Sequence, residues 1–323
     1  MPDSQVSIGF IGAGYMGKTH AAILKKDARA RIAAFYDSDA ARAAQAAAEF
    51  DAQAATDVKD LFRLCDAVYI TLPNVRHAEM ALAAIGARKH VSCEKPMATS
   101  LADAHRIFEA AAALPRLFQV GHNRRFAPVY KSARTALAAG SPAFCAELKM
   151  NRGELENPPW TADAGVTGGF LYETPIHILD LGNWLFGPLQ EVYVAGGQRV
   201  YAQEDTFSAV LHYADCHATL TTCAYSGWSF PFERLEIYGR GYTIRTEEME
   251  QLTVNDKTTS YRDLARDERW GYIEEDRLFL DAVEAGGAAP VAAVTARSGL
   301  NSVRAVEAVY ESLRTGKAVR VGG

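Results

Sequence analysis

The glycine spacing near the amino terminus constrains the fold of this chain more than any other feature. An apolar run at residues 6–11 precedes Gly12, Gly14 and Gly17, which follow the pattern G-x-G-x-x-G. This pattern is typical of a buried parallel strand that turns sharply into a helix. Gly12 permits the tight turn, Gly14 lets the backbone approach a pyrophosphate, and Gly17 allows close packing of the helix on the sheet. The stretch therefore predicts a dinucleotide-binding unit.

An acidic residue after the second predicted strand supports nucleotide binding. The β-rich run at residues 31–36 ends at Asp37, twenty positions after Gly17. This is close to the spacing expected for the carboxylate that binds the adenosine ribose hydroxyls. Asp37 would repel a ribose 2′-phosphate and Ser38 is not basic, so the sequence favours NAD over NADP. Arg42 could attract a 2′-phosphate and so favours NADP, which nevertheless remains the less favoured cofactor.

Length and composition indicate a two-domain globular protein. A chain of 323 residues exceeds the usual size of a single core, and we expect domains at residues 1–122 and 123–323. The net charge of −5, without a run of Lys and Arg interleaved with aromatics, argues against a nucleic-acid partner. We find neither a signal-peptide pattern nor an apolar run long enough for a bilayer, so we expect a cytoplasmic protein with no membrane partner.

The cysteines and histidines do not indicate a metal site. The chain has five cysteines, and none of them forms a C-x-x-C pair. Reduced thiols in a reducing compartment explain this pattern. His212 and His217, with Cys216 beside them, form an H-x-x-x-x-H pair across a predicted hairpin turn. Because a convincing third ligand is missing, we expect no metal.

Strands and helices alternate through the first half of the chain. The predicted strands cover residues 6–11, 31–36, 67–72, 90–93 and 117–121. Such alternation predicts a parallel sheet with right-handed crossovers, so the fold class is α/β with an N-terminal Rossmann domain.

Longer β runs dominate the second half. They cover residues 143–151, 191–199, 206–213, 218–226, 233–237 and 242–246. We expect a C-terminal α+β domain with a large, open, mostly antiparallel sheet. The open face of this sheet must be covered by helices or by a second subunit, which predicts a homodimer or homotetramer.

Polar residues follow two of the predicted parallel strands at their carboxyl ends, where open α/β sheets bind ligands. Thr71 and Leu72 end one strand and Pro73 and Asn74 follow it, and Asn74 is either a cofactor contact or a plain turn residue. The segment Glu94-Lys95-Pro96 follows the next strand. Proline has a fixed φ, so it would hold Lys95 in one direction; a surface lysine paired with its neighbour is the alternative.

These segments resemble one known family. Asn74, His77 and the run Lys-His-Val-Ser-Cys-Glu-Lys-Pro-Met-Ala at residues 89–98 are similar to the glucose-fructose oxidoreductase/inositol dehydrogenase/rhizopine-catabolism (Gfo/Idh/MocA) family, which has an E-K-P signature after a Rossmann strand. The resemblance implies that Lys95 reaches the reacting carbon and the nicotinamide ribose, and that Pro96 shapes the turn, often as a cis peptide. The family usually has Gly where this chain has Arg88, so we expect the preceding helix to end differently, at Gly86.

The resemblance continues at the junction of the two predicted domains. The segment Gly-His-Asn-Arg-Arg-Phe at residues 121–126 is similar to the family's interdomain segment. It implies that Asn123 lies near the nicotinamide and that Arg124 or Arg125 braces the domain interface. A solvated basic turn is the alternative for each arginine.

A second informative stretch contains Glu173, His177 and Asp180. Their spacings of four and three place them on one face if a helix already runs at Glu173. A histidine with apolar neighbours is more often structural than catalytic. The family segment changes this interpretation, because it implies that His177 is the general acid/base and that Glu173 and Pro175 replace an Asp and a Gly. The replaced Asp assists the histidine or binds substrate, so Glu173 joins Lys95 and His177 as a predicted catalytic residue, with substrate binding alone as the alternative. Asp180 is expected to orient other groups.

The remaining site predictions concern contacts. Aromatic residues could line a sugar pocket or simply fill the core; they are Trp160, Tyr172, Tyr225, Trp228 and Trp270. The residues expected to bind the cofactor are Gly12, Gly14, Tyr15, Met16, Gly17, Asp37, Ser38, Arg42, Thr71, Leu72, Pro73, Asn74, His77, Glu94, Lys95 and Asn123. The residues expected to bind substrate are Lys95, Trp160, Tyr172, Glu173 and His177.

Together these patterns predict an NAD-dependent oxidoreductase acting on a secondary alcohol of a sugar, inositol or related polyol. The hydroxyl proton would pass to His177 while Lys95 holds the same oxygen. One alternative is a redox-neutral enzyme that uses tightly held NAD for glycoside cleavage or elimination. Another is a non-catalytic NAD(H) sensor, although a sensor needs neither Lys95 nor His177.

Overall fold

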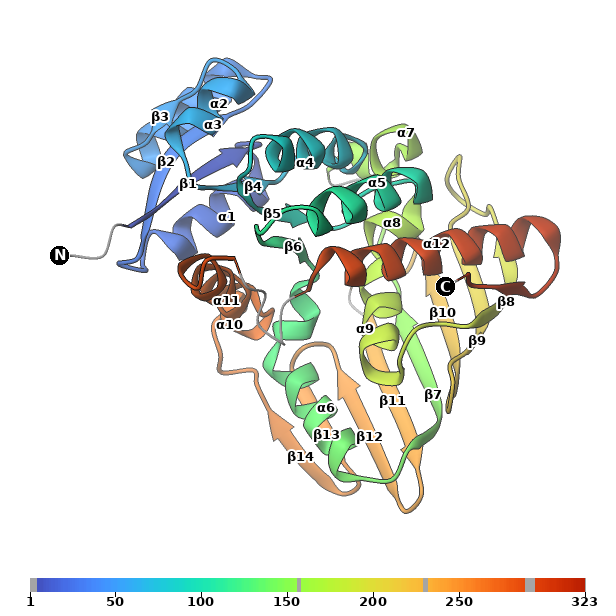
Figure 1. Ribbon diagram of the computed structural model, residues 1–323. Coiled ribbons are helices and arrows are strands. Elements are labelled where there is room, and N and C mark those ends of the chain that lie inside the picture. Colours follow the sequence, from blue (N-terminus) through green and yellow to red (C-terminus); the bar gives the residue numbers. More distant parts are fainter. Residues whose placement is uncertain (1–4, 156–157, 229–231, 288–293, 323) are drawn as a thin grey trace. The chain divides into compact units, whose positions relative to one another are not determined.

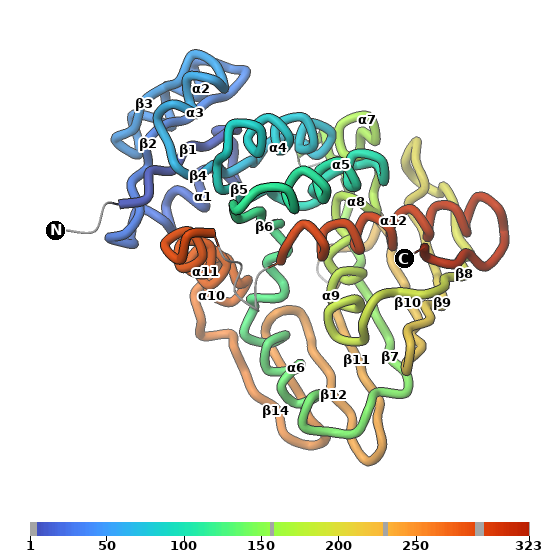
Figure 2. Tube along the Cα trace, in the orientation of Figure 1, coloured from blue at the N-terminus to red at the C-terminus, as the bar shows by residue number. Residues whose placement is uncertain are grey.

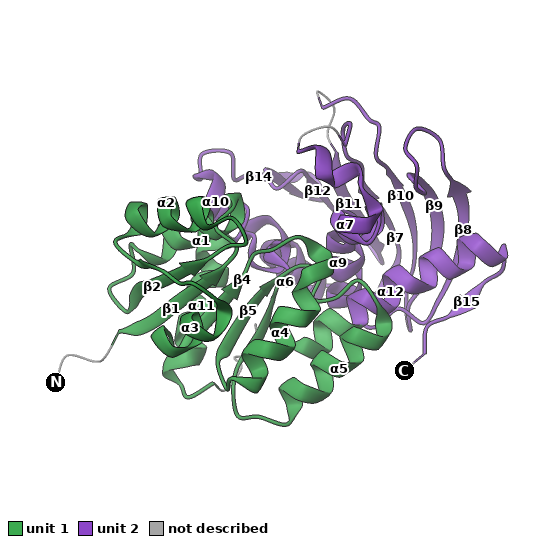
Figure 3. Cartoon of the chain, turned by 90° about the horizontal axis from the view of Figure 1, so that it is seen from above, with its two compact units in different colours: residues 1–121, 272–300 green, residues 122–271, 301–323 purple. Residues whose placement is uncertain are grey.

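The computed structural model describes residues 5–155, 158–228, 232–287 and 294–322 (Figure 1). The chain divides into two compact units (Figure 3). Unit 1 contains residues 1–121 and 272–300, and unit 2 contains residues 122–271 and 301–323. Unit 1 thus includes residues 272–300, which the expected division after residue 122 assigns to the second domain.

Unit 1 contains the predicted doubly wound parallel sheet. Its strand order is β3-β2-β1-β4-β5-β6, and the pairings are parallel. The strands are β1 Val6–Ile11, β2 Ala30–Tyr36, β3 Gln53–Ala54, β4 Ala67–Ile70, β5 His90–Glu94 and β6 Phe118–Gly121. The order reverses between β1 and β4, and such a switch point is where open α/β sheets bind ligands.

The helices of unit 1 follow the strands, and one of them comes from the late segment. They are α1 Tyr15–Leu24, α2 Ala40–Phe50, α3 Val58–Leu64, α4 His77–Gly86, α5 Leu101–Ala112 and α11 Tyr272–Glu284. Figure 1 shows α11 beside α1, from the opposite end of the sequence. The ring of Phe279 on α11 packs edge-on against Tyr69, with ring centroids 5.1 Å apart. The core of unit 1 is therefore complete only when α11 is in place.

Helix α4 ends where expected, and the residue beyond its end that takes the left-handed conformation is Arg88. Gly86 is the last helical residue, and the left-handed position belongs to Arg88, with a φ of +58°. The Arg88 N–H donates to Ile85 and the Lys89 N–H donates to Ala84, both at backbone carbonyls. This is the Schellman arrangement, in which glycine is normally favoured because it has no Cβ.

Unit 2 is built on a nine-stranded sheet, which Figure 2 shows as a set of long neighbouring segments. The order is β14-β13-β12-β11-β7-β10-β9-β8-β15. The strands are β7 Ala143–Met150, β8 Glu191–Gly197, β9 Thr206–His212, β10 His217–Cys223, β11 Glu233–Gly239, β12 Tyr242–Glu247, β13 Gln251–Val254, β14 Lys257–Ser260 and β15 Val319–Arg320. The mostly antiparallel sheet is confirmed, and the β7–β10 pair is parallel.

Buried and exposed side chains alternate along the central strands of this sheet, so one face is packed and the other is open. The longer helices of unit 2 are α6 Pro128–Ala139 and α9 Ile176–Phe186, and α12 Ala296–Thr315 begins in the last residues assigned to unit 1. The shorter ones are η2 Asn123–Phe126, η3 Pro159–Ala162, α7 Ala164–Thr167, α8 Phe170–Glu173 and α10 Arg266–Arg269.

Candidate cofactor and catalytic sites

The glycine loop joins β1 to α1 and leaves open space at its centre. Gly12 has a φ of +104°, and a Cβ there would lie 2.6 Å from the Thr71 carbonyl oxygen. A Cβ on Gly17 would lie 2.3 Å from the Gly12 carbonyl oxygen, whereas one on Gly14 would meet nothing within 4 Å. The fold therefore requires Gly12 and Gly17, and Gly14 leaves room for a ligand at the N-terminus of α1. This cradle fits a dinucleotide pyrophosphate.

Asp37 lies at the end of β2 and is already tied to the glycine loop. Its Oδ2 accepts a hydrogen bond of 2.9 Å from the Ala13 N–H, and its Oδ1 accepts one of 2.9 Å from the Asp39 N–H. The Arg42 guanidinium also lies 3.1 Å from Oδ1. A carboxylate has room for further donors, so Asp37 can still receive ribose hydroxyls.

Thr71 and His77 connect the loop after β4 to the loops after β1 and β5. The Thr71 hydroxyl donates to the Gly12 carbonyl oxygen at 2.8 Å, which connects this loop to the glycine loop. The buried His77 ring has Nδ1 2.6 Å from the Pro96 carbonyl oxygen and Nε2 2.7 Å from that of Leu72. Burial lowers the pKa of His77, although the two carbonyl oxygens oppose this shift. His77 thus links the carboxyl ends of β4 and β5.

Lys95 lies in the turn after β5. Its side chain is half-buried, the Lys95–Pro96 peptide bond is cis, and its N–H donates to Glu94 Oε2 at 3.1 Å. The carboxyl ends of β1, β4 and β5 lie at one edge of the parallel sheet, so the turn with Lys95 and the glycine loop share that edge.

The other residues predicted to bind the cofactor surround this edge. Tyr15 is 66% exposed at the start of α1, and Met16 is half-buried beside it. Ser38 is exposed, Leu72 is half-buried, Pro73 is exposed, and the Asn74 side chain is buried. The Tyr15 ring is therefore accessible to a ligand at the start of α1.

In unit 2 the segment from Glu173 to Asp180 is not one continuous helix. Helix α8 ends at Glu173, Thr174 and Pro175 interrupt the helix, and α9 starts at Ile176. Glu173, His177 and Asp180 were expected on one helix face only if the helix already runs at Glu173. Because the helix is interrupted after Glu173, this condition is not met. His177 is 7% exposed in the first turn of α9, with its ring centroid 5.9 Å from that of His122 in an edge-to-face arrangement.

Glu173 has a cationic partner that the sequence did not reveal. Its Oε1 lies 3.1 Å from Nη1 of Arg152, and the same nitrogen donates to the Thr174 hydroxyl at 3.1 Å. Arg152 follows β7, so it comes from a distant part of the sequence. Arg152 thus contacts both Glu173 and Thr174, at the break before α9.

Asp180 lies one turn after His177 and is fully buried. Arg125 donates to both of its oxygens, at 2.7 and 2.6 Å, and the Ser302 hydroxyl donates at 2.8 Å. Burial alone would raise the pKa of Asp180, but Arg125 and His122 hold it below the usual value. Asp180 thus anchors η2 and the start of α12 to α9.

Asn123 and Arg124 also form contacts inside unit 2. The Asn123 amide donates to the Trp270 carbonyl oxygen at 2.9 Å. Arg124 pairs with the buried Glu233 at 3.1 Å, and its guanidinium lies 4.8 Å from the centroid of the Trp270 ring. The prediction of a solvated basic turn is therefore wrong for Arg124, because it is 5% exposed.

Comparisons with known proteins agree with this geometry. Residues 6–122 match a family model described as an oxidoreductase family with an NAD-binding Rossmann fold, and residues 140–321 match the model of its C-terminal alpha/beta domain. The chain belongs to the Gfo/Idh/MocA oxidoreductase family. The resemblance found in the sequence is confirmed, and so are the α/β fold class and the expectation of an oxidoreductase with an NAD-binding Rossmann domain.

Several relatives span nearly the whole chain. Inositol 2-dehydrogenase 2 of Saccharopolyspora erythraea is 32% identical over 98% of this chain and 95% of its own length. Myo-inositol 2-dehydrogenase of Thermotoga maritima is 26% identical over 86% of this chain and 88% of its own. A levoglucosan dehydrogenase structure in complex with NADH has a TM-score of 0.90 at 19% identity, with 99% and 100% of the two chains covered. This last likeness concerns the fold alone.

The aromatic residues of this Gfo/Idh/MocA member divide into two groups. Tyr172 is 1% exposed, and its hydroxyl donates to Glu307 at 2.5 Å, so it lies in the core of unit 2. Trp160, Tyr225 and Trp228 are exposed by 41%, 37% and 58%. The exposed rings are therefore the ones accessible to a sugar in this structure.

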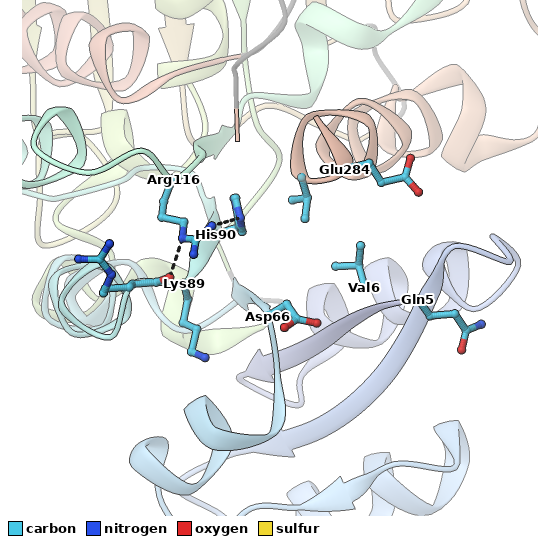
Figure 4. Close-up of a pocket in the computed structure, with 9 residues that line it drawn as sticks. Gln5, Val6, Asp66, Lys89, His90, Arg116 and Glu284 are labelled. Carbon is cyan, nitrogen blue, oxygen red and sulfur yellow. Dashed lines mark hydrogen bonds between the residues drawn. The ribbon is translucent and has the colours of Figure 1, made fainter. Parts of the chain in front are cut away.

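A polar pocket of about 680 Å³ lies elsewhere in unit 1 (Figure 4). It is lined by Gln5, Val6, Asp66, Arg88, Lys89, His90, Arg116, Val283 and Glu284. Several of these residues come from the starts of β1, β4 and β5, so the pocket lies at the amino edge of the sheet. The predicted cofactor residues lie at the opposite, carboxyl edge.

The described residues also bear on metal binding and on membrane insertion. Among them, no group of three or more His, Cys, Asp or Glu side chains is arranged to hold a metal ion. His212 and His217 are cross-strand neighbours in the β9–β10 hairpin. None of the helices within the described ranges combines the length and apolar character needed to cross a membrane. All five cysteines are free thiols.

Proposed function

We propose that this chain oxidises a secondary alcohol of a sugar, inositol or related polyol, or reduces the corresponding ketone. The observation that carries the proposal is the position of Lys95 after β5, at the same edge of the same sheet as the open glycine loop after β1. The likeness to inositol 2-dehydrogenases supports the substrate class. Bound NAD supplies the hydride-accepting carbon.

The proposed roles divide between two side chains. Lys95 holds the reacting oxygen and stabilises the negative charge that develops on it. His177 accepts the hydroxyl proton during oxidation and returns it during reduction. Its environment supports this role, because the first turn of α9 is held by the buried Asp180 and Arg125 pair, which keeps the ring in place.

Glu173 is proposed to bind substrate hydroxyls. Its carboxylate is held by Arg152, and the two oxygens of a carboxylate together offer about four acceptor positions for donors. The interruption at Thr174 and Pro175 separates Glu173 from the helix that carries His177. We therefore assign Glu173 to substrate binding and proton transfer to His177.

NAD rather than NADP is proposed as the working cofactor. Asp37 would repel a 2′-phosphate, and Arg42, which could otherwise attract one, is paired with Asp37 at 3.1 Å. The cytoplasm is the proposed compartment, because five free thiols suit a reducing environment.

A homodimer or homotetramer through the sheet of unit 2 is also proposed. Tyr193 and Val210 are directly paired across β8 and β9 on the open face, with 49% and 37% exposure. Phe144 on β7 is a further exposed apolar residue, at 54%. A second copy that covers this face would bury these side chains.

The test is NADH formation, followed by absorbance, with purified protein, NAD and a panel of inositols, aldoses and deoxysugars. Lys95→Ala and His177→Ala should each lower kcat by about 10²- to 10⁴-fold while NAD binding persists. The exposed Lys59 and His217 provide matched controls, since Lys59→Ala and His217→Ala should keep full activity.

Other outcomes would replace this proposal. Cofactor retained through purification with no net NADH, together with cleavage of a glycoside, would indicate redox-neutral chemistry. NAD binding without turnover of any polyol or glycoside would favour the sensor.

A further inference from the structure

A cluster of ionisable side chains lies buried in unit 1, beneath the turn that carries Lys95. It consists of His20 on α1, Tyr69 on β4, Glu94 at the end of β5, and Glu275 and Asp276 on α11. His20, Tyr69, Glu275 and Asp276 are each at most 3% exposed. The neighbouring Tyr272 ring lies edge-on to the His20 ring, with centroids 5.7 Å apart.

The cluster is organised as a chain of contacts around His20. Its Nδ1 lies 2.8 Å from Asp276 Oδ1, and its Nε2 lies 3.3 Å from Glu94 Oε1. The Tyr69 hydroxyl donates to the same Asp276 oxygen at 3.0 Å. A histidine that faces a carboxylate at each ring nitrogen can donate to both only as an imidazolium.

The charges support this arrangement. Burial alone would lower the pKa of His20, but Asp276 and Glu94 raise it well above its usual value. Burial would likewise raise the pKa of Glu94, yet the His20 contact and Lys95 hold it down. Burial raises the pKa of Glu275 well above its usual value.

The contact chain ends at the Lys95 backbone. Glu94 Oε1 faces His20, while Glu94 Oε2 accepts the Lys95 N–H at 3.1 Å. Gly121 on β6 leaves space for this carboxylate, because a Cβ there would lie 3.1 Å from Glu94 Oε2. The Glu94 side chain thus contacts His20 through one oxygen and the backbone of the Lys95 turn through the other.

We propose that Asp276 and His20 form a positioning relay that orients Glu94 and thereby fixes the turn of Lys95. The relay residues themselves touch neither substrate nor cofactor. The expected change in kcat rests on the proposed function. The expected change in the order of the Lys95 turn does not, because it can be measured without a substrate.

The energetics favour a positioning role over a purely stabilising one. Buried ion pairs are often replaceable by well-packed apolar side chains with little loss of stability, so burial of these charges does not by itself explain them. A displacement of a catalytic group by about 1 Å can cost about 100-fold in rate. A rigid support for Lys95 therefore has a direct kinetic benefit.

The decisive experiment is hydrogen–deuterium exchange of the full-length protein without substrate, read by mass spectrometry at the Lys95 amide. Asp276→Asn and His20→Gln should each increase exchange at Lys95 by at least about tenfold. Arg277→Gln is the matched control, since the exposed Arg277 adjoins Asp276 on α11 but pairs with the half-buried Glu274 and Asp281. It should leave Lys95 exchange unchanged.

The outcomes decide the inference in either direction. Unchanged Lys95 exchange in both relay variants would overturn it, as would an equal increase in Arg277→Gln. If His20→Gln fails to fold, Asp276→Asn still decides, because asparagine keeps an oxygen for the Tyr69 hydroxyl.

Kinetics add a second readout with the substrate found above. Asp276→Asn and His20→Gln should lower kcat by about 10- to 100-fold with less than about threefold change in NAD affinity. The double variant should lose no more kcat than the worse single variant, because the two residues act through one carboxylate. Additive losses would overturn the relay. If no polyol turns over, the proposed function fails, while exchange at Lys95 still decides the relay.

Discussion

Individual buried charges define the candidate site of unit 2. Asp180 is fully buried and makes a bidentate contact with Arg125 and a hydrogen bond with Ser302. Removing one partner of such a pair leaves the other charge buried without compensation, which is more costly than replacing both. His177 lies in the helix turn that this pair anchors, so its position depends on Asp180.

Asp180→Asn should therefore destabilise the protein by about 3 kcal/mol, because it leaves the Arg125 charge uncompensated. Urea denaturation followed by circular dichroism measures the change. Glu191→Gln is the control, since Glu191 pairs with the exposed Arg320 at 3.6 Å and should cost less than about 1 kcal/mol. A similar loss in both variants would contradict this prediction.

The pH dependence of stability should report the charge of His20. Its pKa in the folded protein lies well above 6.5, so protonated His20 stabilises the native state fully below about pH 6.5. This contribution is lost as the pH rises through the folded value. Asp276→Asn removes the main partner, so the wild-type advantage over this variant should be greatest in mildly acidic solution and should shrink towards alkaline pH.

The groups that face His20 are Asp276, Glu94, Tyr69, Glu275 and Tyr272. Asp276→Asn changes the first of these and leaves the other four in place. Denaturation midpoints from pH 5 to 9 for wild type, Asp276→Asn and Arg277→Gln provide the measurement. A pH-independent difference for Asp276→Asn would show that His20 is not charged in the folded protein.

At the scale of elements, the sequence patterns predicted those strands and turns that are determined by residues close together in the chain. The β1 run and the glycine loop are as expected, because each depends on residues within a few positions. Contacts between distant segments gave no such signal. His20 and Asp276 are separated by 256 positions, and Arg152 meets Glu173 from the end of another strand.

The same distinction explains the break before α9. A spacing of four predicts a shared helix face for Glu173 and His177, but Pro175 lacks the N–H that a continuous helix needs at that point. The interruption was visible in the sequence as that proline, whereas the pairing of Glu173 with Arg152 was not.

The glycine loop allows a test that separates folding from cofactor binding. Gly17→Ala places a Cβ 2.3 Å from a backbone oxygen and should destabilise the protein, whereas Gly14→Ala meets no atom within 4 Å and should fold normally. Gly14→Ala should nevertheless weaken NAD binding by at least about tenfold, because its Cβ occupies the space proposed for the pyrophosphate. Thermal melts and NAD titration by fluorescence measure the two effects.

The end of α4 provides a second element-level test. A side chain at the left-handed Arg88 position costs about 1 to 2 kcal/mol relative to glycine, and the greater freedom of glycine in the unfolded chain offsets part of that cost. Arg88→Gly should therefore be more stable than Arg88→Ala by about 1 kcal/mol in urea denaturation. Equal stabilities would mean that the strain is relieved by other means.

At the scale of the whole molecule, the chain order does not coincide with the compact units. Residues 272–300 return to unit 1 after strands β7 to β14 of the unit 2 sheet, and β15 of that sheet follows later in the chain. Phe279 and Asp276 of this segment complete the core and the buried cluster of unit 1. The two units are therefore linked through the covalent chain more than once, and folding of the first needs synthesis of nearly the full length.

Assembly through the open face of the unit 2 sheet is the last prediction. Tyr193→Lys with Val210→Lys places two cations in one cross-strand pair, and a symmetric interface would bring copies of these charges together. Sedimentation velocity should show a dimer or tetramer for wild type and a smaller species for the double variant. Val200→Lys, at a 60% exposed position outside the strands, is the control and should leave the oligomer intact. A monomeric wild type would show that this face is open to solvent.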